Sequence, residues 1–353
     1  MKTIFLSFTI KNSSVAEFFL ELSNQLALNY KVIIITYAVE KSDFHISPRI
    51  EVIKWPSKRP TKFKDFIFLS KLIIKHKPEV MIANFGAVNM FLLAGYLLGV
   101  KQRIAWYHTL SAQLEKRKIL QYRKKIFYKM ATQIVANSKA TQDDLIKNFG
   151  VEKSKVKVIY NAVKKSVLLN NVIPYKLVYA GRMHKTKGVD TLIQAIPFVV
   201  KKFPLVNLTL LGDDLKGEQI KKYIEIVNKL EVQNNVNFIG NQNKDKVLEQ
   251  FSSAYITIVP SVVEAFGYVV IESFSVKTPV IGSNTSGIAE IIRNDRDGYL
   301  FEVNNHKDLS DKINHLLGNP RLREQFSNNC FERFLENFEV KGVVNNFREE
   351  FKL

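Results

Sequence analysis

The sequence contains a single cysteine, Cys330, among its 353 residues. One thiol excludes a disulfide framework and a zinc site built on cysteines, and it favours a reducing compartment. Two glycine-rich fingerprints are also missing, the dinucleotide-binding Gly-x-Gly-x-x-Gly and the P-loop Gly-x-x-x-x-Gly-Lys-Ser/Thr. A nicotinamide dehydrogenase is therefore disfavoured. Residues 1–10 lack the small-residue cleavage site of a secretory signal, so we expect a buried strand there.

What the chain does have is an ordinary globular balance, with 46% hydrophobic and 24% charged residues, and enough length for two domains. Its net charge of +19 is unevenly distributed. Residues 1–165 hold 29 Lys and Arg against 11 Asp and Glu, whereas residues 166–353 hold 23 against 22. The first half therefore attracts an anionic partner, such as a membrane surface, a phosphorylated acceptor or a nucleic acid, unless the charge serves solubility alone.

Short runs rich in Val and Ile alternate with amphipathic helical stretches, a pattern typical of parallel sheets covered on both faces. The pattern pauses near residues 166–175 and then restarts. It predicts an α/β fold of two doubly wound domains facing each other across a cleft. The expected parts are a first domain at 1–165, a linker at 166–175, a second domain at 176–335 and a C-terminal helix at 336–353 that packs back on the first domain.

One segment, Val80–Val100, carries no charge over a length that could span a bilayer. Asn84, Gly86 and Asn89 interrupt it. A lone span would also cut an α/β domain in half, so we expect a buried strand, a loop and a buried helix.

Two carboxylates bracket the start of an apolar helix in the stretch Val259-Pro-Ser-Val-Val-Glu264-Ala-Phe-Gly267-Tyr-Val-Val-Ile-Glu272. Glu264 precedes the expected helix and Glu272 lies in its second turn. Both can thus face a cavity at the helix N-terminus, where free backbone N–H groups bind phosphate. Carboxylates also accept hydrogen bonds from sugar hydroxyls. On spacing alone, a capping acid and a surface acid explain the pair equally well.

A second stretch, Val178-Tyr-Ala-Gly181-Arg182-Met-His-Lys185-Thr-Lys187-Gly188, places three cations between a strand and a helix. Cations there suit a diphosphate, with Arg binding in bidentate fashion and Lys acting as a point charge. An exposed basic loop is the alternative.

Together these stretches resemble the retaining glycosyltransferases of family 4, which are group 1 glycosyl transferases with the GT-B architecture of two Rossmann-like domains. The likeness covers most of the chain and is strongest over residues 176–301. There the family's motifs follow in order: Gly181-Arg182, Lys187-Gly188, Phe238-Ile-Gly240, Pro260-Ser261, Glu264-x7-Glu272, Thr278-Pro279-Val280 and Asp297-Gly298.

The resemblance implies a role for particular residues. The second domain would bind a nucleotide-sugar donor through Gly181, Arg182, Lys187, Gly240, Gln242, Glu264, Phe266, Gly267, Tyr268 and Glu272. The catalytic set would be His108, Arg182, Lys187 and Glu264. The acceptor would contact Ser13, Ser14 and His108, although a core or surface imidazole is the alternative for His108.

The sequence departs from the family pattern at three places. Ile10-Lys11-Asn12-Ser13-Ser14 replaces a glycine-rich turn, Ala162 replaces the glycine of Asn-Gly-Val, and Lys277 stands where glycine is usual. The last two are tolerable where the local φ is negative. The acidic pairs at 213–214 and 295–297 are expected to be turns rather than metal ligands, and no metal or other cofactor is expected.

The activity implied by the resemblance is a hexosyltransferase that moves a hexose or N-acetylhexosamine, with retention, from a nucleotide-sugar to a glycan or a polyprenyl-diphosphate-linked acceptor. UDP is the more common nucleotide in the family. The process would be bacterial surface polysaccharide or lipopolysaccharide biosynthesis, and the enzyme would be cytoplasmic, peripheral on the inner face of the plasma membrane, and would bind no nucleic acid.

Two basic stretches, Lys54–Lys77 and Lys101–Lys129, fit an anionic membrane surface because aromatic residues are interleaved with their cations. Solvated helix faces with aromatic rings in the core are the alternative. The aromatic residues are Trp55, Phe63, Phe66, Phe68, Trp106, Tyr107, Tyr122, Phe127 and Tyr128.

Two other functions stay open. A non-hydrolysing sugar-nucleotide epimerase shares the architecture but needs clustered acid–base groups, and the six histidines here are scattered. A basic nucleic-acid-binding protein would explain the charge, but no nucleic-acid motif occurs.

Overall fold

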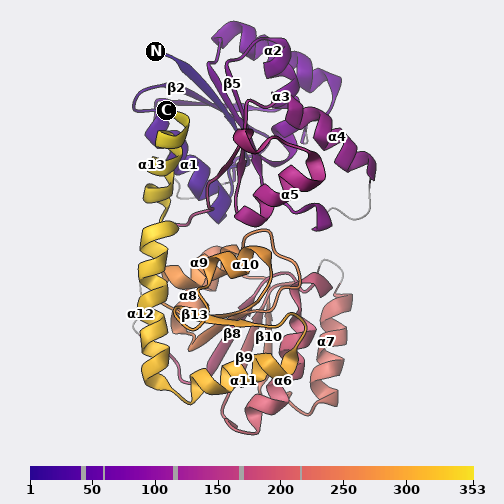
Figure 1. The fold of residues 1–353 in the computed structure, drawn as a ribbon, viewed down its shortest axis with the longest axis vertical. Coiled ribbons are helices and arrows are strands. Elements are labelled where there is room, and N and C mark those ends of the chain that lie inside the picture. The colour runs from indigo at the N-terminus through magenta and orange to yellow at the C-terminus, as the bar shows by residue number, and fades with distance from the viewer. Residues whose placement is uncertain (41–44, 59, 114–117, 167–170, 215–216) are drawn as a thin grey trace. The chain divides into compact units, whose positions relative to one another are not determined.

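A computed structural model of the protein describes residues 1–40, 45–58, 60–113, 118–166, 171–214 and 217–353. The chain forms two compact units (Figure 1), residues 1–162 with 340–353 and residues 163–339. The second unit thus begins before the expected linker, since the Val163 backbone N–H donates to Phe338 O at 3.0 Å within that unit. Residues 167–170 of the expected linker lie outside the described residues.

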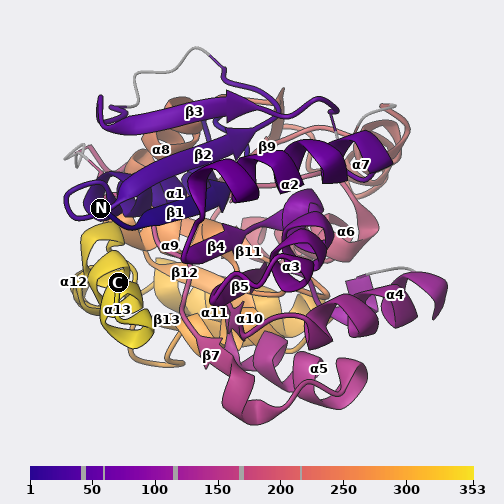
Figure 2. The same cartoon turned by 90° about the horizontal axis from the view of Figure 1, so that it is seen from above.

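The first unit is built on a seven-stranded parallel sheet of order β3-β2-β1-β4-β5-β6-β7, part of which runs across Figure 2. The first six strands along the chain follow the order 3-2-1-4-5-6, which is typical of a doubly wound domain, and β7 extends the sheet beyond β6. The strands are β1 (Thr3–Ser7), β2 (Lys31–Thr36), β3 (Ile50–Lys54), β4 (Val80–Ala83), β5 (Gln102–Tyr107), β6 (Gln133–Ala136) and β7 (Val156–Val158).

Helices cover both faces of this sheet. Helix α1 (Ser14–Leu26) and the C-terminal helix α13 (Val340–Phe351) share one core with β1 and β5, where Trp106 stacks on Phe347. The opposite face is covered by four helices, α2 (Phe63–His76), α3 (Val88–Leu97), α4 (Lys118–Lys129) and α5 (Lys139–Phe149). The C-terminal helix α13 therefore belongs to the same unit as the N-terminal residues.

The second unit contains a six-stranded parallel sheet of order β10-β9-β8-β11-β12-β13. Its strands are mostly buried, as their Val- and Ile-rich sequences predict, except for the edge strand β10, in which Asn237 and Ile239 are exposed. They are β8 (Lys176–Ala180), β9 (Asn207–Leu211), β10 (Val236–Gly240), β11 (Ile256–Val259), β12 (Val280–Ser283) and β13 (Gly298–Phe301).

Helices again cover this sheet on both faces. One core contains residues of α6 (Val189–Val200), α7 (Glu218–Lys229) and α11 (His306–Leu317), and a smaller one contains residues of α8 (Lys244–Ser253). The remaining helices are α9 (Tyr268–Ser275), α10 (Ser286–Ile291) and the long α12 (Pro320–Asn337), which packs on α9. Two doubly wound parallel sheets confirm the predicted α/β fold class.

The uncharged stretch from residue 80 to 100 forms strand β4 and helix α3, with the single-turn 3-10 helix η1 (Phe85–Ala87) between them. This confirms the expected strand, loop and helix. None of the helices formed by the described residues combines the length and the hydropathy of a membrane span.

The aromatic residues of the two basic stretches mostly belong to the core. Trp55, Trp106, Tyr107 and Tyr128 are each at least 95% buried, because strand and helix periodicity turns them inward. Only Phe63 and Tyr122 of the nine are largely exposed, at 76% and 69%. The expectation that these aromatics line a surface is therefore wrong for most of them.

Candidate active site

In the second sheet the strand order reverses between β8 and β11, which lead to opposite halves of the sheet. Ligands of open α/β sheets bind at such a point, beyond the carboxyl ends of the strands. The loop after β8 contains the 3-10 turn η4 (Lys185–Lys187), and its Thr186 O accepts a backbone hydrogen bond from Val262 N in the loop after β11, at 2.9 Å. The two loops are thus joined through their backbones.

Gly188 permits this close approach. Its φ is +64°, and a Cβ at this position would lie 2.0 Å from Pro260 O. Glycine follows Lys187 in the motif for a steric reason, because any side chain at residue 188 would push the two loops apart.

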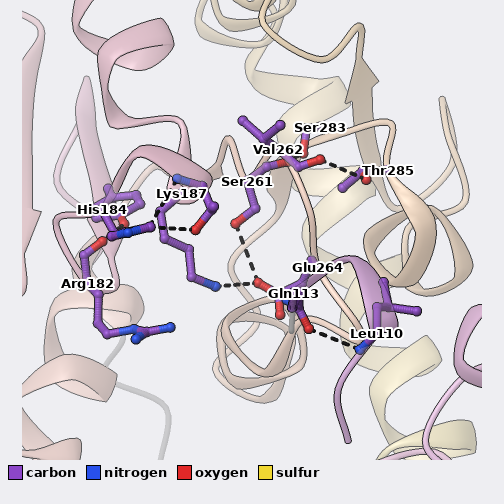
Figure 3. Close-up of polar contacts among 12 residues, drawn as sticks. Leu110, Gln113, Arg182, His184, Lys187, Ser261, Val262, Glu264, Ser283 and Thr285 are labelled. Carbon is purple, nitrogen blue, oxygen red and sulfur yellow. Dashed lines mark hydrogen bonds and ion pairs between the residues drawn. The ribbon is translucent and has the colours of Figure 1, made fainter. Parts of the chain in front are cut away.

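The side chains of these loops meet in an ion pair (Figure 3). Lys187 Nζ lies 2.5 Å from Glu264 Oε2, and the two side chains are only 21% and 18% exposed. Ser261 Oγ donates to the same carboxylate oxygen at 3.5 Å. A cation and an acid 77 residues apart in sequence are thus brought to one point at the reversal of strand order.

A cavity of about 380 Å³ lies at the carboxyl ends of β8 and β9. Arg182, which is exposed, lines it, and in the view of Figure 3 its side chain runs in the same direction as that of Lys187. Gly212, at φ +132°, allows the β9 loop to pass the β8 loop, because a Cβ there would lie 1.8 Å from Gly181 O. The complete lining is Ala180, Gly181, Arg182, Leu211, Gly212, Asp213, Asn241, Gln242 and Val247.

The turn after β10 supplies the far wall of this cavity. Gly240 adopts φ +69°, and Gln242 is fixed by a bond from its Nε2 to Ile239 O at 2.9 Å. The Phe238-Ile-Gly240 motif thus predicts that this turn belongs to the binding site. The sequence analysis did not predict that residues 211–213, after β9, form another wall of the cavity. The glycine directly after strand β9 is the signal that could have found it.

Helix α9 begins directly after the loop of Glu264. Its N-cap, Gly267, has φ +115° and makes no side-chain capping bond, and Tyr268 is the first residue of the helix. Phe266 is buried, and its backbone passes so close to Gly287 that a Cβ there would lie 2.4 Å from Phe266 Cα. Glu272 is half-buried in the second turn of the helix, as the sequence predicts.

One aspartate of each acidic pair accepts a hydrogen bond from a nearby backbone N–H group, which is typical of a turn or a helix start. Asp297 is completely buried, and it accepts hydrogen bonds from Arg293 N, at 2.7 Å, and Arg293 Nε. Burial raises the pKa of Asp297, and the bonds from Arg293 oppose that rise. Asp214 accepts a bond from Gln219 N at 2.6 Å at the start of α7. Within the described ranges, no three His, Cys, Asp or Glu side chains gather as metal ligands would.

In the first unit, His108 follows strand β5. Its ring stacks on Phe85, with centroids 4.6 Å apart, and its Nε2 is buried with no hydrogen-bond partner among the described residues. Burial lowers the pKa of His108 to about 3, so the imidazole is neutral at physiological pH. Because it is neutral, it can exchange a hydrogen bond with a sugar hydroxyl but cannot stabilise a negative charge by its own charge.

The loop that carries His108 is held by Asp144 of α5. The carboxylate accepts hydrogen bonds from Tyr107 Oη at 2.6 Å and from Ser111 N at 2.9 Å, on either side of His108. Asn148 Nδ2 also donates to it, at 2.7 Å. A buried acid with several donors fixes the loop geometry.

The three departures from the family pattern have different outcomes. Ser13 Oγ accepts a bond from Ala16 N and caps α1, and Ser14 is buried as the first residue of that helix. Ala162 is not among the residues with positive φ, but Lys277 has φ +64°. Lys277 therefore does not meet the condition of a negative φ, because the tight turn from α9 into β12 needs the left-handed conformation whichever residue is present.

Two family models match consecutive parts of the chain. The model of glycosyl transferases group 1 matches residues 163–333, and that of glycosyltransferase family 4 matches residues 15–166. The chain belongs to the group 1 glycosyltransferases. The epimerase and nucleic-acid alternatives receive no support from either match.

Relatives of this group 1 glycosyltransferase are similar over different lengths. The glycosyltransferase MJ1178 of Methanocaldococcus jannaschii is 30% identical over 64% of this chain, and the match covers 62% of that protein's length. The capsular polysaccharide biosynthesis glycosyltransferase CapM of Staphylococcus aureus is 26% identical, over 82% of this chain and 83% of its own. Among solved structures, HepE of Anabaena in complex with UDP matches with a TM-score of 0.80 and 19% identity, with all of both chains covered. That similarity confirms the GT-B fold.

Proposed function

We propose that this protein is a retaining glycosyltransferase that transfers a hexose or N-acetylhexosamine from a UDP-sugar to a glycan or lipid-linked acceptor in surface polysaccharide biosynthesis. The observation that carries the proposal is the Lys187–Glu264 ion pair at the reversal of strand order, next to the cavity lined by Arg182. Family membership supports glycosyl transfer, and the names of CapM and of the UDP complex of HepE support the process and the nucleotide.

The chemistry of donor cleavage follows from these charges. When the anomeric C–O bond breaks, negative charge accumulates on the departing diphosphate. Arg182, Lys187 and the N-terminal end of the α9 dipole supply positive charge to that group. Gly240, Gln242 and Glu272 bind the nucleoside, while Glu264, Phe266, Gly267 and Tyr268 contact the donor sugar.

No step of this scheme needs a metal ion, because the two cations and the helix terminus neutralise the diphosphate. Retention without a nucleophile of the protein then requires attack from the side of the leaving group, with a phosphate oxygen taking the proton of the acceptor hydroxyl. The alternative of inversion is decided by the anomeric configuration of the product, read by NMR coupling constants.

Donor binding is tested by the thermal unfolding of the purified protein with UDP, UDP-sugars and GDP-sugars. At a hundred times its dissociation constant, a ligand adds about 2.7 kcal/mol to stability, which is a shift of several degrees. Arg182→Ala should lose the shift with UDP, whereas Arg321→Ala, an exposed arginine of α12 outside the cavity, should keep it. No shift with any nucleotide in the wild-type protein would contradict the proposal.

An anionic membrane surface as partner is supported by exposed apolar side chains on α2 and α4. These helices both pack on α3, on one face of the first sheet. Exposed lysines and arginines flank the apolar residues, and the single acid of α2, Asp65, is buried. Apolar residues beside cations suit a peripheral helix on anionic lipid. The exposed residues are Phe63, Ile67, Ile74, Ile119, Tyr122 and Ile126.

Vesicle sedimentation tests this surface. We expect binding to phosphatidylcholine vesicles that contain phosphatidylglycerol, loss of binding at high salt, and little binding to phosphatidylcholine alone. Phe63→Ser with Ile119→Ser should weaken binding. Leu205→Ser, which changes an 80% exposed leucine of the second unit, is the matched control. Equal binding to neutral and anionic vesicles would contradict the proposal.

A further inference from the structure

A second cavity, of about 550 Å³, lies in the second unit, at the edge of the sheet opposite the candidate active site. Its walls include Pro174, Tyr255 and Thr278, which come shortly before strands β8, β11 and β12. Because these strands are parallel and adjacent, their amino ends lie at one edge of the sheet. The cavity is therefore separate from the one lined by Arg182, which lies at carboxyl ends of strands.

Helix α12 forms another wall of this cavity and is fixed to the sheet at two points. Ser327 Oγ donates a hydrogen bond to Lys277 O, in the turn before β12, at 2.5 Å. Arg323 Nε donates to Tyr255 O at 3.2 Å, and its guanidinium lies over the Tyr255 ring, 5.1 Å from the centroid. The space between the helix and the sheet edge is thus bounded by segments that are bonded to one another.

Two of the residues that line the cavity are cations without an acidic partner. Arg323 is half-buried, and burial lowers the pKa of its guanidinium. Its hydrogen bonds go to the backbone oxygens of Tyr255 and Ala254, and neither Arg323 nor Lys277 forms an ion pair with a described carboxylate. Glu324 also lines the cavity, but it is exposed. An anion in the cavity would supply the missing counter-charge.

The buried thiol of Cys330, on α12, shows that the two cations act on the same region. Burial raises the pKa of this thiol, the Asp297 carboxylate raises it further, and the charges of Arg323 and Lys277 lower it. Since Coulomb interactions weaken with distance, both cationic groups lie near this thiol. Like charges that share a region repel each other, and a bound anion would relieve that repulsion.

The backbone of Lys277 supplies an independent observation. Its φ is +64°, a conformation that glycine adopts without strain and that is unfavourable for lysine. Lysine nevertheless stands here in place of the glycine of the family pattern. Strained residues cluster at ligand sites, where the strain is offset by a function. At this position the offsetting gain is the ammonium group that Lys277 brings to the cavity.

We propose that Lys277 and Arg323 form a binding site for a phosphorylated small molecule, separate from the donor site and independent of the identity of the donor. The free N–H groups of Arg323 bind phosphate oxygens, and Lys277 acts as a point charge. A phosphate monoester carries a charge of about −1.5 to −2 at neutral pH, which matches two cations better than a single carboxylate does. The volume of the cavity leaves room for an organic part.

The test uses the full-length protein, with glycerol 3-phosphate and inorganic phosphate as probes and the width of their phosphorus NMR signals as the measure of binding. We expect the wild-type protein to broaden these signals, both without UDP and with UDP in excess. Arg182→Ala, which alters the other cavity, should broaden them equally. Equal affinity for both probes would show that the phosphate group alone is recognised, and higher affinity for glycerol 3-phosphate would show that the organic part contributes.

Lys277→Gly removes the charge and relieves the backbone strain, so the variant should fold. It should raise the dissociation constant of glycerol 3-phosphate at least about tenfold, the scale of one lost charge-assisted hydrogen bond. Lys77→Gly is the matched control and should leave that constant unchanged, because Lys77 is an exposed lysine at φ +46° in the first unit.

Several results would overturn the site. They are the absence of broadening by the wild-type protein, loss of broadening with excess UDP or in Arg182→Ala, and wild-type affinity in Lys277→Gly. Equal weakening by Lys277→Gly and Lys77→Gly would also overturn it, because the effect would then depend on overall charge and not on this cavity.

Discussion

Replacing Lys187 by methionine removes one charge from the proposed donor site and keeps the length of the side chain. In the structure the ammonium group is paired with Glu264, at 2.5 Å. A bound diphosphate must compete with that carboxylate, so part of the attraction of Lys187 for the ground state is cancelled. The attraction grows when charge develops on the departing diphosphate, and the loss should therefore fall mainly on kcat.

The expected effects on kcat and on the affinity for UDP therefore differ in size. Removal of a single stabiliser of developing charge lowers kcat by about 10²–10³, or about 2.7–4 kcal/mol. The dissociation constant of UDP should rise by about tenfold, since one charge-assisted hydrogen bond is partly offset. Steady-state kinetics with the UDP-sugar that gives the largest thermal shift, and calorimetric titration with UDP, measure the two quantities.

The same loop offers a matched control. Lys185 is exposed and lies in the same 3-10 turn, so Lys185→Met changes the charge of the loop equally while leaving the ion pair with Glu264 intact. It should keep kcat within about threefold of wild type, the scale of a surface charge. An equal loss in both variants, or a change in UDP affinity as large as the change in kcat, would refute the reasoning.

Three further predictions concern stability. Lys277→Gly should raise the free energy of unfolding by about 0.5–1 kcal/mol in urea titrations, because glycine adopts φ +64° without strain; a decrease would show that the lysine side chain matters more. Gly212→Ala should lower it by more than about 2 kcal/mol and abolish UDP binding, since the new Cβ would lie 1.8 Å from Gly181 O; wild-type unfolding would contradict the loop geometry. In the unfolded state the His108 imidazole binds a proton near its ordinary pKa of 6.5, whereas in the native state it does so only near a pKa of about 3. Between these pH values the unfolded state therefore binds more protons, and the free energy of unfolding of the wild-type protein decreases as the pH is lowered from 6.5 towards 3. His108→Phe should remove that part of the fall, and an unchanged difference in stability between pH 7 and pH 4.5 would argue against a buried imidazole.

Much of the fold could be predicted because it is encoded locally. Runs of Val and Ile alternate with amphipathic stretches, and each run becomes a strand with little disturbance from distant residues. The loops after β8 and β11 could be found from the Arg, Lys, Glu and Gly spacing. That Lys187 and Glu264 touch could not, since it depends on the sheet order and on Gly188 passing Pro260.

The surface of the first unit was the hardest part to predict. Basic stretches with aromatic residues suggest a surface, but whether Trp106 or Ile119 is exposed depends on which face of each element meets the sheet. In the structure Trp106 is only 3% exposed, whereas Ile119 is 83% exposed. The sequence marks Asn84 only as an interruption of an apolar run, because an unsatisfied buried amide has no sequence pattern.

The sequence by itself determined the succession of strands and helices, the uneven charge and the motif residues of the second unit, since these depend on neighbours along the chain. Tertiary structure alone decided which of those residues contact one another, which aromatic rings are buried, and that Lys277 must adopt the left-handed backbone conformation. The physical reason is that packing and close backbone approach join segments far apart in sequence, and their geometry is fixed only when the sheets form.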